Sequence, residues 1–419
     1  MTAELSQSET APRQRVVVVG GGAAGFFAAI TCAEANPGLR ITILEKTAHF
    51  LSKVRISGGG RCNVTNRISE PKELCQNYPR GRTSLIGPFH AYTSRNTMDW
   101  FESRGVRLKT EPDGRVFPIT DSSQTIIDCL TRSAQRAGVE LRSNASVESV
   151  KQMSDGFEVQ LANNEKIQCN KLMLATGGCR TPAAGQLAAA IGHTLEPPVP
   201  SLFTFHVAVP WLRELAGISV PLAQVSVPSA KLREQGPMLI THSGLSGPAI
   251  LRLSAWGARA LHAVDYKFTL HVNWVPQFNA ESMAKELESH RKTSPSRLLV
   301  NLPISPLAAR LWEALVLASN IPRETRWADL SGAARHHLIQ KLTHMELPVT
   351  GKSLNADEFV TCGGVCLSEV NFKTMESKIV PGLYFGGELL DIDGITGGFN
   401  FQSAWTTGWL AGNAMAKNA

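Results

Sequence analysis

The chain has 419 residues, of which 43% are hydrophobic and 18% are charged, and its formal net charge is +7. This length predicts two or three domains with complete cores, and the composition is typical of a globular protein. No apolar run reaches the roughly 18 residues that a membrane span needs, so we expect no transmembrane segment, no signal peptide and a cytoplasmic location. Residues 1–14 are polar, and we predict a disordered tail there.

The charged residues and the cysteines exclude several kinds of site. Lys and Arg are dispersed and never form a block of five or six, so we attribute the charge to a solvated surface rather than to a nucleic-acid partner. The eight cysteines show no C-x-x-C spacing and no clustering with histidines. We therefore predict no metal site and thiols kept in a reducing compartment.

The first ordered segment has the pattern of a dinucleotide-binding unit. Val16–Val19 predicts a buried strand, the turn Gly20–Gly25 follows, and the apolar stretch Ala23–Ala35 predicts a helix. A second strand, Ile41–Leu44, ends at Glu45. The glycines allow a tight turn and the close approach of a pyrophosphate to a helix N-terminus. The Glu45 carboxylate suits ribose hydroxyls and repels a 2′-phosphate, which favours FAD or NAD over NADP.

The second informative stretch is the loop Lys53–Asn66. It contains three consecutive glycines, Gly58-Gly59-Gly60, followed by Arg61-Cys62-Asn63. Such a loop allows the backbone to approach a planar or phosphorylated ligand while its side chains donate hydrogen bonds.

The middle of the chain changes character at a proline cluster. Strands are predicted at 139–150, 156–161 and 166–175, and the last ends in Ala175-Thr176-Gly177-Gly178, which suggests another approach to the dinucleotide. After Pro197, Pro198 and Pro200, residues 198–276 predict a β subdomain and residues 277–347 a helical subdomain. This block has no phosphate-binding signature, so we interpret it as an insertion.

The last part returns to glycine-rich sequence. A strand beginning at Gly382 leads to the acidic turn that contains Glu388 and Asp391, and Gly397-Gly398 then precedes a helix of small residues. This order predicts a second helix N-terminus that faces the same ligand.

These stretches together resemble the BaiN-like family of NAD(P)/FAD-dependent oxidoreductases, from about Arg15 to Ala416. The most specific motifs are Ile56–Asn66, Thr241–Pro248 and Gly382–Glu388 followed by Gly397-Gly398. The resemblance implies an α/β fold: a discontinuous, glutathione-reductase-like Rossmann FAD-binding domain (15–197 and 348–419) with an inserted β-barrel-like plus helical domain (198–347). Family members include a reductase of unsaturated steroid-type ketones and proteins named as aminoacetone oxidases.

The resemblance also implies where FAD binds. Its adenosine and pyrophosphate are expected on the glycine turn and Glu45, its adenine side near Val147, and its ribityl chain and ring near Arg61-Cys62-Asn63 and Gly397–Asn400. The residues expected to contact FAD are Gly20, Gly22, Ala23, Ala24, Gly25, Glu45, Lys46, Lys53, Ser57, Gly59, Gly60, Arg61, Cys62, Asn63, Thr65, Val147, Ala175, Thr176, Gly177, Gly387, Glu388, Asp391, Gly397, Gly398, Phe399 and Asn400.

Three functions remain open from the sequence. The first is an FAD-dependent oxidoreductase that reduces a small carbonyl or alkene substrate with NAD(P)H, which would visit transiently because no second G-x-G-x-x-G unit follows. The second is an oxidase of a small amine that uses O₂. The third is an RNA-binding or RNA-modifying flavoprotein, suggested by a pI near 9.0 and by RNA-modifying relatives of the fold. His242 and Cys62 are the catalytic candidates, and the sequence favours no particular oligomeric state.

Overall fold

The computed structural model describes residues 14–179, 182–353 and 360–417. The chain divides into two compact units, of which the first contains Met1–Pro198 and Val360–Ala419 and the second contains Val199–Phe359. The tail predicted at residues 1–14 lies outside the described residues, except for Gln14. No helix among the described residues has the length and the hydropathy needed to cross a bilayer.

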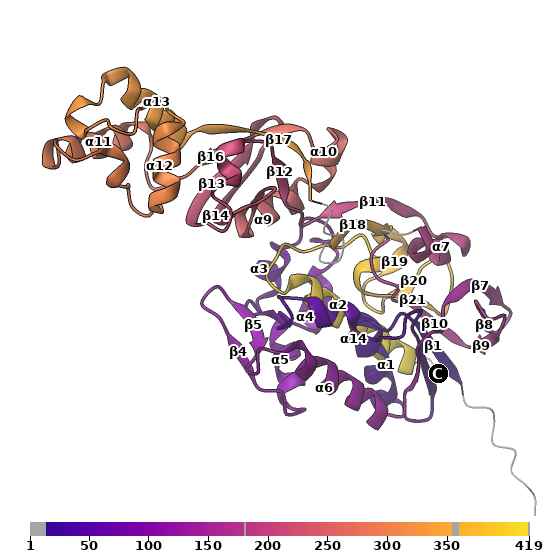
Figure 1. Ribbon diagram of the computed structural model, residues 1–419. Coiled ribbons are helices and arrows are strands. Elements are labelled where there is room, and N and C mark those ends of the chain that lie inside the picture. Colours follow the sequence, from indigo (N-terminus) through magenta and orange to yellow (C-terminus); the bar gives the residue numbers. More distant parts are fainter. Residues whose placement is uncertain (1–13, 180–181, 354–359, 418–419) are drawn as a thin grey trace, which may run out of the picture. The chain divides into compact units, whose positions relative to one another are not determined.

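A seven-stranded sheet forms the centre of the first unit (Figure 1). The five strands from β21 to β6 are parallel, and β19 and β20 add an antiparallel edge. Burial on both faces explains the unbroken Val16–Val19 run in β1, because a parallel strand is covered from both sides. The predicted Rossmann-type α/β fold is confirmed. The strand order is β19 (Val370–Asn371), β20 (Glu376–Ser377), β21 (Leu383–Phe385), β10 (Lys171–Leu174), β1 (Arg15–Val19), β2 (Arg40–Leu44) and β6 (Glu140–Arg142).

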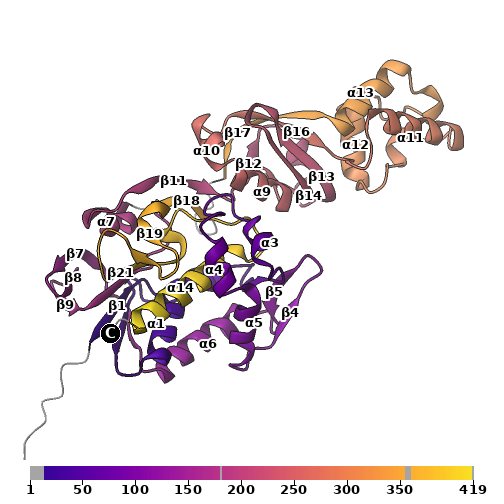
Figure 2. The same ribbon diagram turned by 180° about the vertical axis from the view of Figure 1, so that it is seen from behind.

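Two parallel helices pack tightly in this unit, α1 (Ala23–Ala35) and α14 (Phe399–Lys417), and both views show them together (Figures 1 and 2). A Cβ atom on Gly408 would lie 2.6 Å from the Ala24 carbonyl oxygen, and one on Gly412 would lie 2.5 Å from the Ala28 carbonyl oxygen. The small residues of the last helix therefore serve close backbone packing, which no larger side chain permits.

Smaller elements surround the sheet. Three-stranded sheets are formed by β3, β5 and β4 and by β7, β8 and β9, and β11 pairs with β18. Their bounds are β3 Thr65–Asn66, β4 Leu108–Thr110, β5 Arg115–Pro118, β7 Val147–Met153, β8 Gly156–Leu161, β9 Lys166–Cys169, β11 Leu195–Ser201 and β18 Val360–Val365. The remaining α-helices of the unit are α2 Ser52–Ile56, α3 Pro71–Cys75, α4 Ile86–Ala91, α5 Ser94–Glu102, α6 Ser123–Arg136 and α7 Pro182–Ala190.

The second unit contains a closed six-stranded barrel with strand order β12, β15, β14, β13, β16, β17. Alternate residues of β13 point into its core, including Ala223, Val225 and Val227. This period of two is typical of a sheet with one buried face. The strands are β12 Phe205–Val207, β13 Ser219–Val227, β14 Leu232–Thr241, β15 Gly244–Ser246, β16 Phe268–Asn273 and β17 Met345–Lys352.

A helical segment leaves the barrel after β16 and returns at β17. It contains α11 (Ala280–Thr293), α12 (Ala309–Leu317) and α13 (Gly332–Thr343), which pack around the buried indoles of Trp312 and Trp327. The helices α8 (Pro210–Arg213), α9 (Pro248–Trp256) and α10 (Ala258–Ala263) accompany the barrel strands.

The structure corrects several predicted boundaries. The strands predicted at 139–150 and 166–175 are each two strands, β6 with β7 and β9 with β10, because each pair belongs to different sheets. Residues 198–276 also contain helices α8 to α10, although we predicted a β subdomain. The strand β17 closes the barrel, so the second unit extends beyond the boundary predicted at residue 347.

Candidate functional site

The carboxyl ends of the parallel strands meet at one edge of the sheet. Val19 of β1 is in register with Leu44 of β2 and with Leu174 of β10, and Leu174 is in register with Phe385 of β21. The segments that follow these four strands are therefore neighbours, although they are far apart in the sequence. Ligands of open α/β sheets bind at this edge.

The glycine turn after β1 has the conformation that dinucleotide binding requires. Gly20 has a φ of +113°, and a Cβ atom there would lie 2.2 Å from the Ala175 carbonyl oxygen. A Cβ atom on Gly25 would lie 2.1 Å from the Gly20 carbonyl oxygen, whereas one on Gly22 would meet no atom within 4 Å in the part of the chain that the structure describes. Gly20 and Gly25 thus serve packing, and Gly22 faces open space at the N-terminus of α1.

That N-terminus offers free backbone donors. Gly22 is the N-cap of α1, and no side chain caps the helix. Uncapped N–H groups and the helix dipole favour an anion at this point.

Glu45 lies against the same turn. Its Oε2 accepts a hydrogen bond from the Gly21 N–H (3.0 Å), and its Oε1 accepts one from the Thr47 N–H (2.9 Å). These bonds fix the carboxylate at the end of β2. A shallow hollow beside it is lined by residues 142–146 and 161–163, and Val147 begins the next strand. Glu45 and Val147 are thus brought to one side of the turn, where the adenosine half of FAD was expected.

The Gly58–Asn66 loop meets the start of α14. In the orientation that satisfies both groups, the Asn63 amide donates to the Thr65 carbonyl (3.0 Å) and accepts from the Gly398 N–H (2.9 Å). A Cβ atom on Gly398 would lie 2.4 Å from the Thr65 carbonyl oxygen. Inside the fold, the Thr65 hydroxyl donates to Gln402 (2.6 Å). Hydrogen bonds and close backbone packing therefore join this loop to the N-terminus of α14.

A third contact joins α2, the helix before this loop, to the late acidic turn. Lys53 pairs with Glu388, whose other carboxylate oxygen accepts the Thr361 N–H (2.9 Å). A Cβ atom on Gly178 would meet both the Glu388 carboxylate and the Thr361 hydroxyl at 2.5 Å. The Thr361 hydroxyl is buried without a hydrogen-bond partner among the described residues. An orphaned buried hydroxyl in this position points to a polar group of a ligand.

The two helix N-termini are displaced along their common axis. Ala24 is the second residue of α1, and it lies opposite Gly408, which is the tenth residue of α14. The helix α14 therefore begins eight residues earlier, or about 12 Å farther along the axis. One N-terminus suits a pyrophosphate, and the other lies where the far half of an extended dinucleotide would reach.

Glycines supply the surface between these points. Gly58, Gly59 and Gly60 have consecutive positive φ values of 58°, 68° and 82°. Cβ atoms on Gly59, Gly60 and Gly177 would meet no atom of the described residues within 4 Å. Open backbone, an orphaned hydroxyl and uncapped donors fit a bound FAD, and the residues that would hold it are those at Gly22, Glu45, Gly59-Gly60 and Gly397-Gly398.

Comparison with known proteins identifies the family. Residues 14–414 match the HI0933-like protein Rossmann domain. This protein belongs to the HI0933-like family. A ribosomal RNA dihydrouridine synthase of Escherichia coli K12 is 32% identical over 402 residues, covering 94% of this chain and 96% of the relative. The 3-dehydro-bile acid delta(4,6)-reductase of Clostridium scindens is 29% identical, covering 96% and 99%. A ribosomal RNA dihydrouridine synthase of Haemophilus influenzae is 28% identical, covering 96% and 98%.

A solved structure supports the fold. The 3-ketosteroid-delta4-(5alpha)-dehydrogenase of Rhodococcus jostii RHA1 superposes with a TM-score of 0.52 at 14% identity, covering 98% of both chains. This HI0933-like protein is therefore an FAD-dependent oxidoreductase with a Rossmann FAD-binding domain and an inserted six-stranded barrel. Two of its relatives are named for a reaction on RNA, which the dispersed charge of the sequence did not indicate.

Several predicted site residues of the HI0933-like chain have other partners in the structure. Arg61 pairs with Glu111 (2.8 Å), and its guanidinium lies over the Phe117 ring. These contacts hold the guanidinium against β5 and the turn before it. Asp391 accepts the Gly363 N–H (2.9 Å). Lys46 is exposed beside Glu45, and Asn400 exchanges hydrogen bonds with Gly394 (2.8 Å).

The two weak catalytic candidates differ in their surroundings. Cys62 is fully buried, and desolvation raises its pKa to about 12, opposed by a hydrogen bond with Ser57. A thiol with this pKa does not form the thiolate that redox or nucleophilic chemistry needs. His242 is exposed in the turn between β14 and β15 of the second unit.

Sequence reasoning missed an ion pair near the site. Arg80 forms a bidentate pair with Asp393, whose side chain is completely buried. The Tyr78 hydroxyl donates to the Phe399 carbonyl (2.6 Å) at the start of α14. These partners are more than 300 residues apart, and the only sequence signal was the acidic turn itself.

One constellation outside this edge has the connectivity of a hydrolase triad. Ser377 Oγ lies 2.9 Å from His193 Nε2, and His193 Nδ1 lies 3.0 Å from Glu369 Oε2. However, Ser377 Oγ also accepts the N–H groups of Ile379 (2.9 Å) and Val380 (2.8 Å), and both Ser377 and His193 are buried. The two N–H groups occupy both lone pairs of the buried Ser377 oxygen, so none is left to attack a substrate, and the network serves the fold.

Proposed function

We propose that this protein reduces a carbon–carbon double bond conjugated to a carbonyl group, that the substrate is a uridine in RNA, and that NAD(P)H is the transient reductant. The observation that carries the proposal is the 32% identity over nearly the whole chain to a protein named as a ribosomal RNA dihydrouridine synthase. The cradle at the sheet edge supports it, because the reaction needs a bound redox cofactor.

The chemistry joins the two kinds of relative. A dienone and a uracil ring both contain a C=C bond conjugated to a C=O group, which accepts a hydride at the β carbon and a proton at the α carbon. For uridine these are C6 and C5. The balanced reaction is uridine + NAD(P)H + H⁺ → dihydrouridine + NAD(P)⁺.

The chain's own residues position the cofactor. Bound FAD would supply a two-electron carrier between reductant and substrate. The N–H groups at the start of α1 would hold its pyrophosphate, Glu45 its ribose, and the Gly58–Gly60 loop with Gly397-Gly398 its far half. Only one G-x-G-x-x-G unit occurs in the sequence, which supports a reductant that visits and leaves rather than one with its own domain.

The second unit offers cations for a phosphate backbone. Arg291, Lys292, Arg297 and Arg326 are exposed, and Arg291 also pairs with Glu288 (3.8 Å). A backbone bridge between Leu298 and Arg326 places Arg297 and Arg326 next to each other. Arg326 also donates to the Ser296 carbonyl (3.2 Å). We call these four residues the α11 basic patch. Phosphate contacts of this kind supply sequence-independent affinity for RNA.

A second candidate substrate is a small polycyclic enone. The 29% identity to a protein named as a bile acid reductase favours it. The chemistry is the same, but the substrate would be apolar and the α11 basic patch would be irrelevant.

The first experiment identifies the reaction. The FAD-loaded protein is mixed anaerobically with NADH or NADPH, and the expected result is rapid bleaching of the flavin followed by reoxidation when RNA lacking dihydrouridine is added. Mass analysis of the RNA nucleosides should then show a gain of two hydrogen atoms on uridine. Reoxidation by a steroid dienone but not by RNA would favour the second candidate. Bleaching by an amine but not by NAD(P)H would favour an oxidase and overturn the proposal.

The second experiment tests the RNA contact. Arg297→Glu with Arg326→Glu should weaken RNA binding at least about tenfold and reduce its salt dependence. Arg132→Glu with Arg136→Glu on the exposed face of α6 changes the net charge equally and is the matched control. If both double variants lose RNA affinity equally, the effect comes from the overall charge and not from the α11 basic patch.

A further inference from the structure

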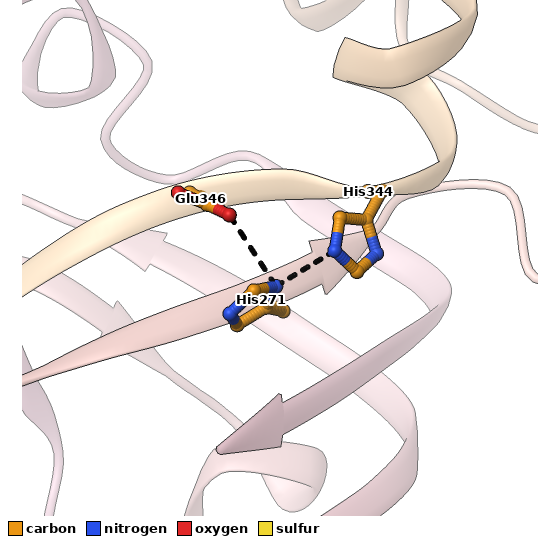
Figure 3. A group of neighbouring side chains, drawn as sticks. All are labelled: His271, His344 and Glu346. Carbon is orange, nitrogen blue, oxygen red and sulfur yellow. Dashed lines mark hydrogen bonds and ion pairs between the residues drawn. The ribbon is translucent and has the colours of Figure 1, made fainter. Parts of the chain in front are cut away.

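Three potential metal ligands lie close together in the second unit. None of them belongs to the FAD cradle. His271 lies on β16, His344 is the C-cap of α13, and Glu346 lies on β17. His271 Nδ1 is 2.9 Å from His344 Nε2 and 4.0 Å from Glu346 Oε1. The three side chains point toward one another (Figure 3), and their ligand atoms all lie within 4.8 Å.

The barrel fixes two of the three ligands. His271 and Glu346 are directly opposite each other in the antiparallel pairing of β16 with β17. Directly opposed residues lie on the same face of the sheet, so the strand pairing holds the two side chains next to each other. His344 precedes Glu346 by two residues, where α13 ends and β17 begins.

The distances suit an ion. Two nitrogen atoms that are each about 2.05 Å from one metal ion lie about 2.9 Å apart at a right angle and about 3.3 Å apart at the tetrahedral angle. The observed 2.9 Å equals the right-angle value, and tetrahedral binding would move the two nitrogens apart by about 0.4 Å. The Glu346 side chain is 65% exposed and therefore free to move its carboxylate toward the two rings. Two imidazoles and a carboxylate are ligands that Zn²⁺ and related ions prefer.

The location gives such an ion a structural task. The chain leaves the barrel after β16 for the helical segment and returns at β17, and the cluster lies at both connections. The backbone N–H of Trp274 already donates to the Leu342 carbonyl (2.8 Å) across these connections. An ion held by residues of both strands and of the helix end would fasten the helical segment to the barrel at its two points of attachment.

We propose that His271, His344 and Glu346 bind one divalent transition metal ion of the imidazole-preferring class, with Zn²⁺ as the probe, and that the ion braces the two connections between barrel and helical segment. His271 Nδ1 and His344 Nε2 would each bind the ion through a lone pair. The hydrogen that now lies between these two nitrogens would move to the other nitrogen of its own ring. Neutral rings thus release no net proton. The proposal departs from the expectation of no metal site, which rested on the absence of C-x-x-C spacing and of cysteines clustered with histidines.

Metal titration of the full-length, FAD-loaded protein without a polyhistidine tag tests the proposal. Isothermal titration with Zn²⁺ should show one equivalent bound, and Co²⁺ should give the absorption bands of a site with nitrogen and oxygen ligands. His344→Ala and Glu346→Gln change exposed side chains and should each weaken Zn²⁺ binding at least about tenfold. Zn²⁺ should also raise the Tm of the wild type and leave that of His344→Ala unchanged.

The matched control is His337→Ala, because His337 is exposed on α13 but outside the cluster. It should retain the wild-type affinity. Absence of saturable Zn²⁺ binding in the wild type, or equal binding by the wild type and His344→Ala, would overturn the proposal and leave a hydrogen-bonded histidine pair. Circular dichroism of each variant verifies that the fold is retained.

Discussion

Gly22→Ala separates cofactor binding from folding. The backbone of Gly22 is extended (φ −93°, ψ −169°), which alanine adopts without strain, and among the described residues no atom lies within 4 Å of the added Cβ. Alanine is a poorer N-cap than glycine by about 0.5–1 kcal/mol, but it restricts the unfolded chain by a similar 0.4–1 kcal/mol. We expect the free energy of unfolding of the flavin-free protein to change by less than about 1 kcal/mol.

The effect on FAD should be much larger. The methyl group would occupy the space through which a pyrophosphate approaches the N–H groups of α1, so the Kd for FAD should rise at least about tenfold, or about 1.4 kcal/mol. The measurement is titration of flavin-free protein with FAD, followed by quenching of flavin fluorescence. Urea unfolding monitored by circular dichroism gives the stability.

Two further glycine variants serve as comparisons, one more disruptive than Gly22→Ala and one neutral. A Cβ on Gly25 lies 2.1 Å from the Gly20 carbonyl oxygen, so Gly25→Ala must displace the turn by about 1 Å and should cost about 1–3 kcal/mol of stability as well as FAD affinity. Gly332→Ala, at the open start of α13, should change neither. Wild-type FAD affinity in a folded Gly22→Ala variant would refute the assignment of the cradle.

Three other predictions concern buried groups of the first unit. Burial lowers the pKa of His193 from 6.5, and the bond to Glu369 opposes this shift. Near that pH the unfolded chain therefore binds more protons than the folded chain. The contribution of His193 to stability should be present above pH 6.5 and lost as the pH falls through the lower pKa of the folded state, and urea unfolding from pH 7.5 to 5 measures this loss. Arg80→Ala leaves the buried Asp393 carboxylate without its guanidinium and should cost about 3–5 kcal/mol. Cys62 should resist iodoacetamide in the native protein and react after unfolding, as peptide mass analysis will detect.

Each of these has an outcome that contradicts it. A His193→Gln variant that keeps the wild-type pH dependence would assign the slope to other groups. A loss below about 1 kcal/mol for Arg80→Ala would mean that water reaches Asp393. Alkylation of native Cys62 at the rate of a free thiol would show that the loop opens.

The sequence predicted the parts of the site whose conformation is local. The helix Ala23–Ala35 has the predicted bounds, and the strand predicted at Val16–Val19 begins one residue earlier, because residue period, φ range and helix propensity act over a few neighbours. Glu45 followed from its place at the end of the second strand. The Gly58–Gly60 loop and the helix start after Gly397-Gly398 were also predicted from the residues, and the family resemblance assigned both to FAD.

What the sequence by itself determined is therefore an FAD-binding unit of known family with a large insertion. Only the tertiary structure decided that Asn63 reaches Gly398, that Lys53 pairs with Glu388, and that His271 meets His344 across 73 residues. Such contacts depend on strand order and on barrel closure, which arise from burial summed over the whole chain and leave no signature in any short segment.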